Sequence, residues 1–170
     1  MAERRILGID PGSRAMGFGV ISASGNRIRY IAAGVVRPKT LEPFSYRLME
    51  LYQGISEVIS QYSPSEASIE QVFVARNAKA ALKLGHARAA ALLSALNGGL
   101  DLFEYTPLEI KKAVSGYGQA EKEQVRQMVK LLLGLDKSPA MDASDALAAA
   151  ICHANSSAMR IRLNLATSNR

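Results

Sequence analysis

Four acidic residues occupy positions from which their carboxylates can act together. Asp10 follows the apolar run ILGI, and Glu70 comes near the end of the alternating stretch EASIEQV. Asp142 and Asp145 are three residues apart at the start of an alanine-rich segment, a spacing that puts both on one face of a helix. Carboxylates without a cluster of histidine or cysteine are typical ligands of Mg²⁺ or Mn²⁺. Two such ions about 4 Å apart activate water and stabilise the leaving oxygen of a phosphodiester, and we expect this chemistry here.

Each of these residues also has an interpretation that needs no metal. Asp10 precedes Pro11-Gly12, and an aspartate in this position commonly bonds the backbone of its own turn. Asp142 or Asp145 can instead cap a helix or complement the positive end of its dipole. One aspartate is enough for that purpose, and two on one face repel each other unless a cation is present. The pair therefore favours the metal site.

The hydrophobic pattern predicts the elements that hold the first acid. Short apolar or alternating runs with turn residues between them predict three strands, at residues 6–10, 16–20 and 28–36. Their short connections predict an antiparallel meander. From Ser45 the apolar residues recur at helical spacing, which predicts a helix over residues 45–62 that ends at Ser63-Pro64.

The second acid lies on the next predicted strand, at residues 66–72. Because a helix connects this strand to the meander, the crossover rule makes it parallel to the first strand. Asp10 and Glu70 then lie at the same edge of the sheet. This edge, at the carboxyl ends of the strands, is where open α/β sheets bind ligands.

The remaining elements complete an α/β fold with a five-stranded mixed sheet and helices on both faces. A core stripe on the helix at 120–133 is formed by Val125, Met128, Val129, Leu132 and Leu133. The broad face of small residues on the helix at 77–96 is expected to contact both the sheet and a second subunit. The other predicted elements are a strand at 100–105 and helices at 106–114 and from 141 to about 158. We expect one domain over residues 1–158, followed by a basic, mobile tail at 159–170.

The bulk composition favours a globular protein with a polyanionic partner. The chain has 170 residues, 48% of them hydrophobic, and a net charge of +6. Its only cysteine, Cys152, excludes an internal disulfide and favours a reducing compartment. We expect neither a signal peptide nor a membrane span. Together with the four acids, the basic charge indicates a metal-dependent nuclease on a ribonuclease H-like sheet.

Four blocks of the sequence resemble one protein family. These are GIDPGSRAMGFGV, IEQVFVARNAKAALKLGHARA, GQAEKEQV and DASDALAAAICH. In their order and spacing they are similar to the RuvC family of Holliday-junction resolvases, and the similarity extends over nearly the whole chain. The resemblance implies a ribonuclease H-like fold and a homodimer that cleaves four-way (Holliday) DNA junctions with Mg²⁺, during homologous recombination and DNA repair.

The resemblance also implies roles for particular residues. It makes Asp10, Glu70, Asp142 and Asp145 the catalytic metal ligands. Phe73 matches an aromatic residue that stacks on an unpaired base at the junction centre. The matched basic residues that hold the scissile strand near the metals are Lys111 and Lys122. It further implies the RuvA and RuvB branch-migration proteins as partners, and the bacterial cytoplasm as the location.

Plainer roles remain open for several of these residues. Phe73 continues the alternation of its strand and can be a core residue, and Lys111 and Lys122 can be ordinary surface lysines. His86 and His153 lie on predicted helices, and we expect them to be surface or core residues, not ligands.

Three other functions are alternatives to the nuclease. DPGSRAMGFG superficially resembles the phosphate loop of actin-like phosphotransferases, but that fold needs a duplicated domain that 170 residues cannot hold. A non-catalytic DNA-binding subunit gains nothing from four acids. A general nuclease of the same fold, acting on RNA or on other branched DNA, stays open on sequence alone.

Overall fold

A five-stranded mixed sheet forms the centre of the molecule. The computed structural model describes residues 3–71 and 77–168, with side chains as far as Ser157. The strand order is β3-β2-β1-β4-β5, with β1, β2 and β3 antiparallel and with β4 and β5 parallel to β1. The predicted meander and the predicted parallel crossover are therefore confirmed. The strands are β1 (Arg4–Asp10), β2 (Met16–Ser24), β3 (Arg27–Val36), β4 (Glu66–Glu70) and β5 (Asp101–Tyr105).

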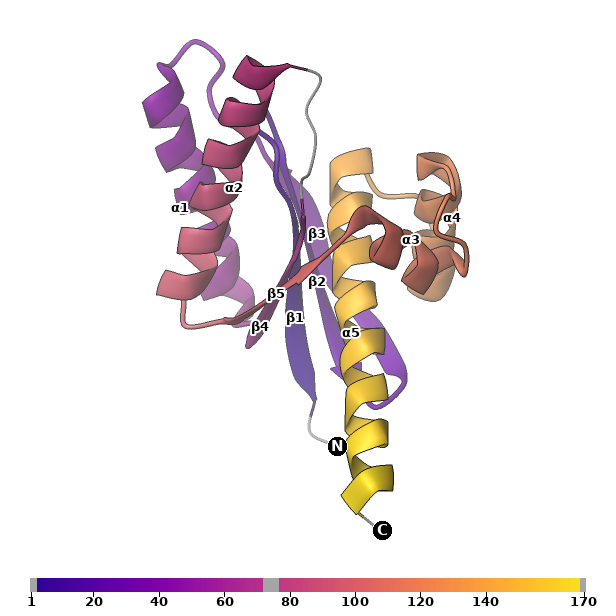
Figure 1. Ribbon diagram of the computed structural model, residues 1–170. Coiled ribbons are helices and arrows are strands. Elements are labelled where there is room, and N and C mark those ends of the chain that lie inside the picture. Colours follow the sequence, from indigo (N-terminus) through magenta and orange to yellow (C-terminus); the bar gives the residue numbers. More distant parts are fainter. Residues whose placement is uncertain (1–2, 72–76, 169–170) are drawn as a thin grey trace.

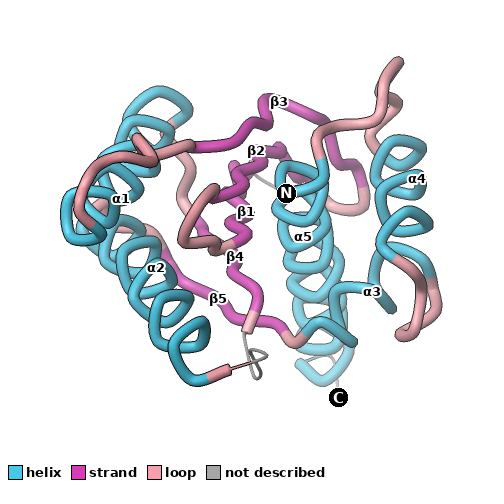
Figure 2. The backbone as a smooth tube through the Cα atoms, turned by 90° about the horizontal axis from the view of Figure 1, so that it is seen from above, coloured by secondary structure: helices cyan, strands magenta, loops and turns pink. Residues whose placement is uncertain are grey.

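Helices cover both faces of this sheet, as predicted (Figures 1 and 2). The pair α1 and α2 packs on one face, and α5 packs on the other, with α3 and α4 outside it. Each face has its own hydrophobic core. The helices are α1 (Phe44–Tyr62), α2 (Ala78–Asn97), α3 (Pro107–Ser115), α4 (Lys122–Leu132) and α5 (Met141–Ser168).

The alternation of β1 determines how closely α5 approaches the sheet. Leu7 and Ile9 point into the core beneath α1 and α2, so Ile6, Gly8 and Asp10 face α5. A Cβ atom at Gly8 would lie 1.9 Å from the carbonyl oxygen of Ala146 on α5. Glycine is therefore required at this position, and α5 lies directly on the strand backbone.

Local caps fix the residues at which α3 and α4 begin. Thr106 and Glu109 form a reciprocal capping box at the start of α3, where Pro107 occupies the first turn. Glu121 and Gln124 form the equivalent box at the start of α4. These caps matter for the site because Lys111 lies on α3 and Lys122 begins α4.

The structure corrects three details of the prediction. Strand β4 ends at Glu70, not at Val72, because its partner β5 ends at Tyr105, the residue that pairs with Glu70. Leu132 is 40% exposed, since α4 packs on α5 through a narrow stripe centred on Val125 and Val129.

The third correction concerns the last helix, which continues to Ser168 and not to about residue 158. No glycine or proline follows Met141 in the sequence, so no strong helix-stopping residue is present. Within residues 3–71 and 77–168, no helix is long and apolar enough to cross a membrane.

Candidate metal centre

Asp10 is positioned by the strand that precedes it and by the turn that follows it. It is the last residue of β1 and pairs with Gly17 on β2. A Cβ atom at Gly12 would lie 2.0 Å from the Ala15 carbonyl oxygen, so the turn after Asp10 needs glycine. The side chain is half-buried at the carboxyl end of the sheet.

Glu70 lies on the same face of the neighbouring parallel strand. Ala67 and Ile69 of β4 are buried in the core beneath α1 and α2, so Ser68 and Glu70 point toward α5. The Ser68 hydroxyl confirms this direction by donating a 2.8 Å hydrogen bond to the Ala149 carbonyl of α5.

The other two acids come from the start of α5. Asp142 and Asp145 lie within the first helical turns, which pass over the end of β2. A Cβ atom at Gly17 would lie 1.9 Å from the Asp142 carbonyl oxygen, so this glycine permits the helix to lie against the strand that pairs with Asp10. All four predicted acids therefore belong to elements that meet at one edge of the sheet.

Burial and neighbouring carboxylates raise the pKa of two of these acids. The pKa of Asp10 is raised from 3.8 to about 8, first by burial and then by repulsion from Asp145, Glu70 and Asp142. Burial also raises the pKa of Glu70, with Asp145 the next cause. The Asp10 carboxyl group is therefore electrostatically coupled to each of the other three acids.

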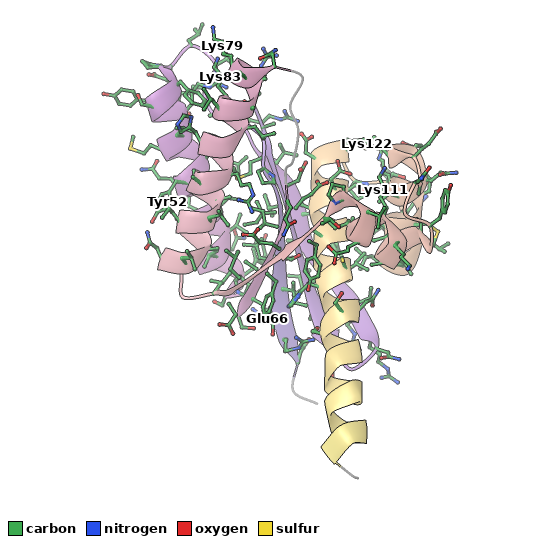
Figure 3. The ribbon with its side chains drawn as sticks, in the orientation of Figure 1. Tyr52, Glu66, Lys79, Lys83, Lys111 and Lys122 are labelled. Atoms are coloured by element: carbon green, nitrogen blue, oxygen red, sulfur yellow. The ribbon has the colours of Figure 1, made fainter. Side chains whose placement is uncertain are left out.

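Two lysines complete the edge. A cavity of about 60 Å³ is lined by both Glu70 and Asp145 together with Lys111 and Lys122. Figure 3 shows the two lysines at the end of the molecule where α5 begins. The Lys122 ammonium lies 3.1 Å from the Asp145 carboxylate, and this ion pair raises the pKa of Lys122.

The chemistry of this donor set fits a hard divalent cation, although the side chains are not arranged as a finished coordination shell. Among the described residues, no three His, Cys, Asp or Glu side chains are grouped closely enough to hold one ion. Oxygen donors with excess negative charge are nevertheless the ligands that Mg²⁺ or Mn²⁺ prefers. Lys122 neutralises part of the negative charge of the carboxylates that a bound metal ion would otherwise neutralise.

The remaining predicted residues have different outcomes. Phe73 lies outside the described residues. His86 is exposed on α2 and contacts the Phe44 ring edge-on at 6.0 Å between ring centroids, whereas His153 is fully buried on α5. Both histidines thus have the surface or core placement that was expected.

Sequence analysis did not identify the partners of His153. Its imidazole bonds Tyr105 and Glu66, and Glu66 in turn pairs with Arg4. The available signal was that Glu66, Ser68 and Glu70 are polar residues alternating with apolar residues along an otherwise buried strand.

A family model and individual relatives all match this chain under one family name. The family described as "Crossover junction endodeoxyribonuclease RuvC" matches residues 6–153. A relative of that name from Alkalilimnicola ehrlichii is 54% identical over 162 residues, which cover 95% of this chain and 98% of that protein. Another, from Geobacter metallireducens, is 51% identical over 156 residues, which cover 92% and 95%.

Solved structures resemble the fold just described. The structure of Thermus thermophilus RuvC in complex with Holliday junction substrate superposes with a TM-score of 0.85 at 33% identity, covering 92% of this chain and 96% of that one. The yeast mitochondrial Holliday junction resolvase Ydc2 shares the fold with a TM-score of 0.67 at 13% identity, covering 97% and 84%. From the family match, the identities and the coverage, we conclude that this chain belongs to the RuvC family of crossover junction endodeoxyribonucleases.

Proposed function

We propose that this protein resolves four-way DNA junctions by paired, metal-dependent hydrolysis of phosphodiester bonds, during homologous recombination and DNA repair. The observation that carries the proposal is that Asp10, Glu70, Asp142 and Asp145 meet at one sheet edge, beside two lysines, in a chain of net charge +6. A mere binder of DNA phosphates would gain nothing from such a concentration of negative charge.

The four acids are proposed as the ligands of two Mg²⁺ ions, which Mn²⁺ can replace. When bound, the ions supply an activated water molecule and stabilise the leaving oxygen. Asp10 has to lose the proton that its raised pKa of about 8 retains, so cation binding at neutral pH releases protons. The fold therefore keeps Asp10 mostly protonated at neutral pH until a cation binds.

Lys122 and Lys111 are proposed to hold the scissile strand. In the described structure Lys122 neutralises Asp145, at 3.1 Å between the charged atoms. Lys122 also lines the cavity beside Glu70 and Asp145, so its ammonium group would be able to pair with a DNA phosphate if Asp145 held a cation instead. Phe73 is proposed to stack on an unpaired base at the junction centre.

The assembly and its setting are further parts of the proposal. We propose a homodimer with α2 in its interface, because Leu82, Leu93 and Leu96 are more than half exposed on that helix. A four-way junction has near two-fold symmetry, which a two-fold dimer matches with two active sites. RuvA and RuvB are the proposed partners in the bacterial cytoplasm. The division into a nuclease domain at 1–158 and a basic segment at 159–170 is likewise proposed.

Cleavage of a synthetic four-way junction tests the function. We expect cutting in Mg²⁺ or Mn²⁺ and none in EDTA, and weak or no cutting of the matching linear duplex and of an RNA–DNA hybrid. Glu70→Gln and Asp145→Asn are expected to lose about a thousandfold in rate while binding the junction in EDTA, since metal-held charge stabilisation is worth several kcal/mol.

The matched control is Glu57→Gln, which changes an exposed carboxylate on α1, on the opposite face of the sheet. This variant is expected to cut at the wild-type rate. If the protein cuts the hybrid or the duplex as fast as the junction, it is a general nuclease and the proposal is wrong.

A further inference from the structure

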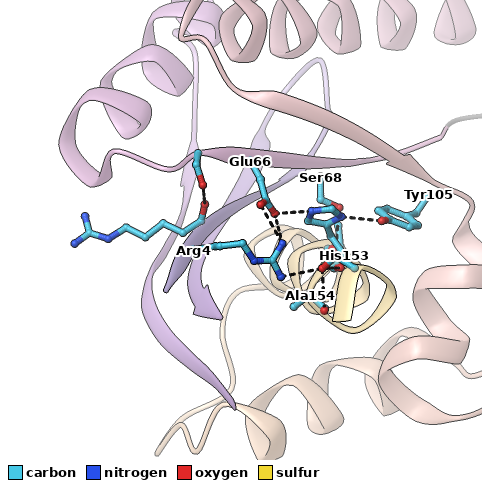
Figure 4. A network of polar contacts seen from close by, with 10 residues as sticks. Arg4, Glu66, Ser68, Tyr105, His153 and Ala154 are labelled. Carbon is cyan, nitrogen blue, oxygen red and sulfur yellow. Dashed lines mark hydrogen bonds and ion pairs between the residues drawn. The ribbon is translucent and has the colours of Figure 1, made fainter. Parts of the chain in front are cut away.

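A largely buried polar network joins α5 to the amino ends of β1 and β4 and to Tyr105, the last residue of β5 (Figure 4). His153 on α5 donates from Nε2 to the Glu66 carboxylate at 2.7 Å, and its Nδ1 lies 2.7 Å from the Tyr105 hydroxyl. Arg4 on β1 donates to both Glu66 oxygens at 3.0 and 2.9 Å and to the Ser157 hydroxyl at 2.9 Å. The network therefore connects β1, β4 and β5 to one helix.

The Arg4 and Glu66 side of this network lies one strand-length from the candidate metal centre, and Tyr105 reaches it from the residue that pairs with Glu70. Strand β1 carries Arg4 at one end and Asp10 at the other, and β4 carries Glu66 and Glu70 in the same way. In Figure 3, Glu66 lies at the end of the sheet remote from Lys111 and Lys122. Helix α5 crosses the sheet between the two ends.

Three rungs with matched spacing connect β4 and α5, two of them hydrogen bonds and the third a shared cavity. Glu66 bonds His153, Ser68 bonds the Ala149 carbonyl, and Glu70 shares a cavity with Asp145. Each step is two residues along the strand, about 6.6 Å, and four residues along the helix, about 6 Å. The separations agree to within a fraction of an ångström, so fixing one rung fixes the others.

Apolar packing alone gives this helix little resistance to sliding. Its contact surface is formed largely by alanines, and it lies against Gly8 and Gly17 with no intervening side chains. Large side chains that interlock are what normally fix the axial position of a helix. Leu147 and Ile151 are the large side chains that interlock with the sheet. The polar rungs add directional contacts that also fix the axial position of α5.

We propose that His153, held by Glu66 and Tyr105, is a positioning residue that sets the register of α5 on the sheet and thereby the placement of Asp142 and Asp145 against Asp10 and Glu70. This inference rests on the proposed metal-dependent function. A buried charged network is a weak source of stability compared with apolar residues of similar volume, so a role in registry explains its presence better than a role in stability alone.

The test compares His153→Leu, which removes both bonds of the imidazole, with His153→Gln, whose amide can still donate to Glu66. Mg²⁺ and Mn²⁺ binding is measured by calorimetry without DNA, and junction cleavage is measured at saturating metal. We expect His153→Leu to bind metal about tenfold or more weakly and to cut at least about tenfold more slowly. His153→Gln is expected to recover most of both losses, and junction binding in EDTA is expected to stay at the wild-type level in both variants.

The matched control is Val58→Ala, which opens the core on the other face of the sheet. It is expected to lower the melting temperature with metal affinity unchanged. If His153→Leu is folded and binds metal with wild-type affinity, the inference is wrong. Should His153→Leu fail to fold, Tyr105→Phe removes a single hydroxyl, and wild-type metal affinity in that variant overturns the inference equally.

The metal-binding measurement also separates this inference from the proposed function. A wild-type protein that binds Mg²⁺ but leaves the four-way junction uncut contradicts the function. The comparison of His153→Leu with His153→Gln by calorimetry remains valid in that case, because it needs no DNA.

Discussion

Replacing Asp10 with Asn should make the metal-free protein less sensitive to alkaline pH. The pKa of Asp10 is about 8 in the folded protein, against 3.8 for the free carboxyl group. A folded-state pKa above the unfolded value means that folding favours the protonated form. The stabilising contribution is complete below the unfolded pKa and is lost as the pH rises through the folded pKa.

The size of the effect follows from the two pKa values. One pKa unit corresponds to about 1.4 kcal/mol, so raising the pH from about 6 to about 8 should lower the free energy of unfolding by about 2 kcal/mol through Asp10 alone. For a chain of this length, that change corresponds to a fall of about 4–8 °C in the melting temperature. The pKa of Glu70 is also raised, so its contribution to stability likewise falls as the pH rises through its folded-state pKa.

Thermal melts in EDTA at about pH 6 and about pH 8 measure the predicted fall in the melting temperature directly. Asp10→Asn keeps the shape of the side chain and removes its titration, so most of the fall should disappear in that variant. Mg²⁺ should restore the melting temperature of the wild type at about pH 8, because the cation binds only the folded site. Mg²⁺ should raise the melting temperature of Asp10→Asn much less.

The matched control is Asp101→Asn, which changes an exposed aspartate at the amino end of β5, the opposite edge of the sheet. It should keep the full pH dependence of the wild type. If Asp10→Asn keeps it as well, the carboxylates do not repel one another in the folded protein, and the electrostatic basis of the metal centre is refuted.

Three more substitutions test separate parts of the structure. Gly17→Ala places a Cβ atom 1.9 Å from the Asp142 carbonyl oxygen, so it should destabilise the fold by about 1–3 kcal/mol and lower junction cleavage at temperatures where melts show it still folded. Lys122→Met removes the ion pair to Asp145, and single-turnover kinetics should show a rate at least about tenfold lower, with metal affinity raised or unchanged. Leu93→Glu introduces a charge at a position that is 55% exposed on α2, and sedimentation should show a monomer with a wild-type melting curve; an unchanged dimer would place the interface elsewhere.

Local pattern in the sequence was sufficient to predict the elements and the edge where the acids gather. The alternation of Ala67 and Ile69 with Ser68 and Glu70 identified β4 and its two faces. The helical crossover then made β4 parallel to β1, which brought Glu70 to the same edge as Asp10. Both inferences use only neighbouring residues and the handedness of chain connections, which a single sequence contains.

Features that depend on the register between distant elements were not predictable in this way. The partners of His153 come from two strands, and nothing near His153 in the sequence identifies Glu66 or Tyr105. Likewise, the exposure of Leu132 depends on how narrow the stripe is through which α4 packs on α5, although its helical spacing matches that of the buried Val125 and Val129. Such properties follow from packing geometry, not from periodicity.

The contribution of α5 to the candidate metal centre has a consequence for synthesis of the chain. Asp10 leaves the ribosome well before Asp142 and Asp145. Until α5 emerges, Ile6 and Gly8 lack the helix that covers their face of the sheet. A chain that ends before α5 therefore lacks two of the four acids of the candidate metal centre and the cover over the central strand. The four carboxylates come together only after α5 has been synthesised and has packed on the sheet.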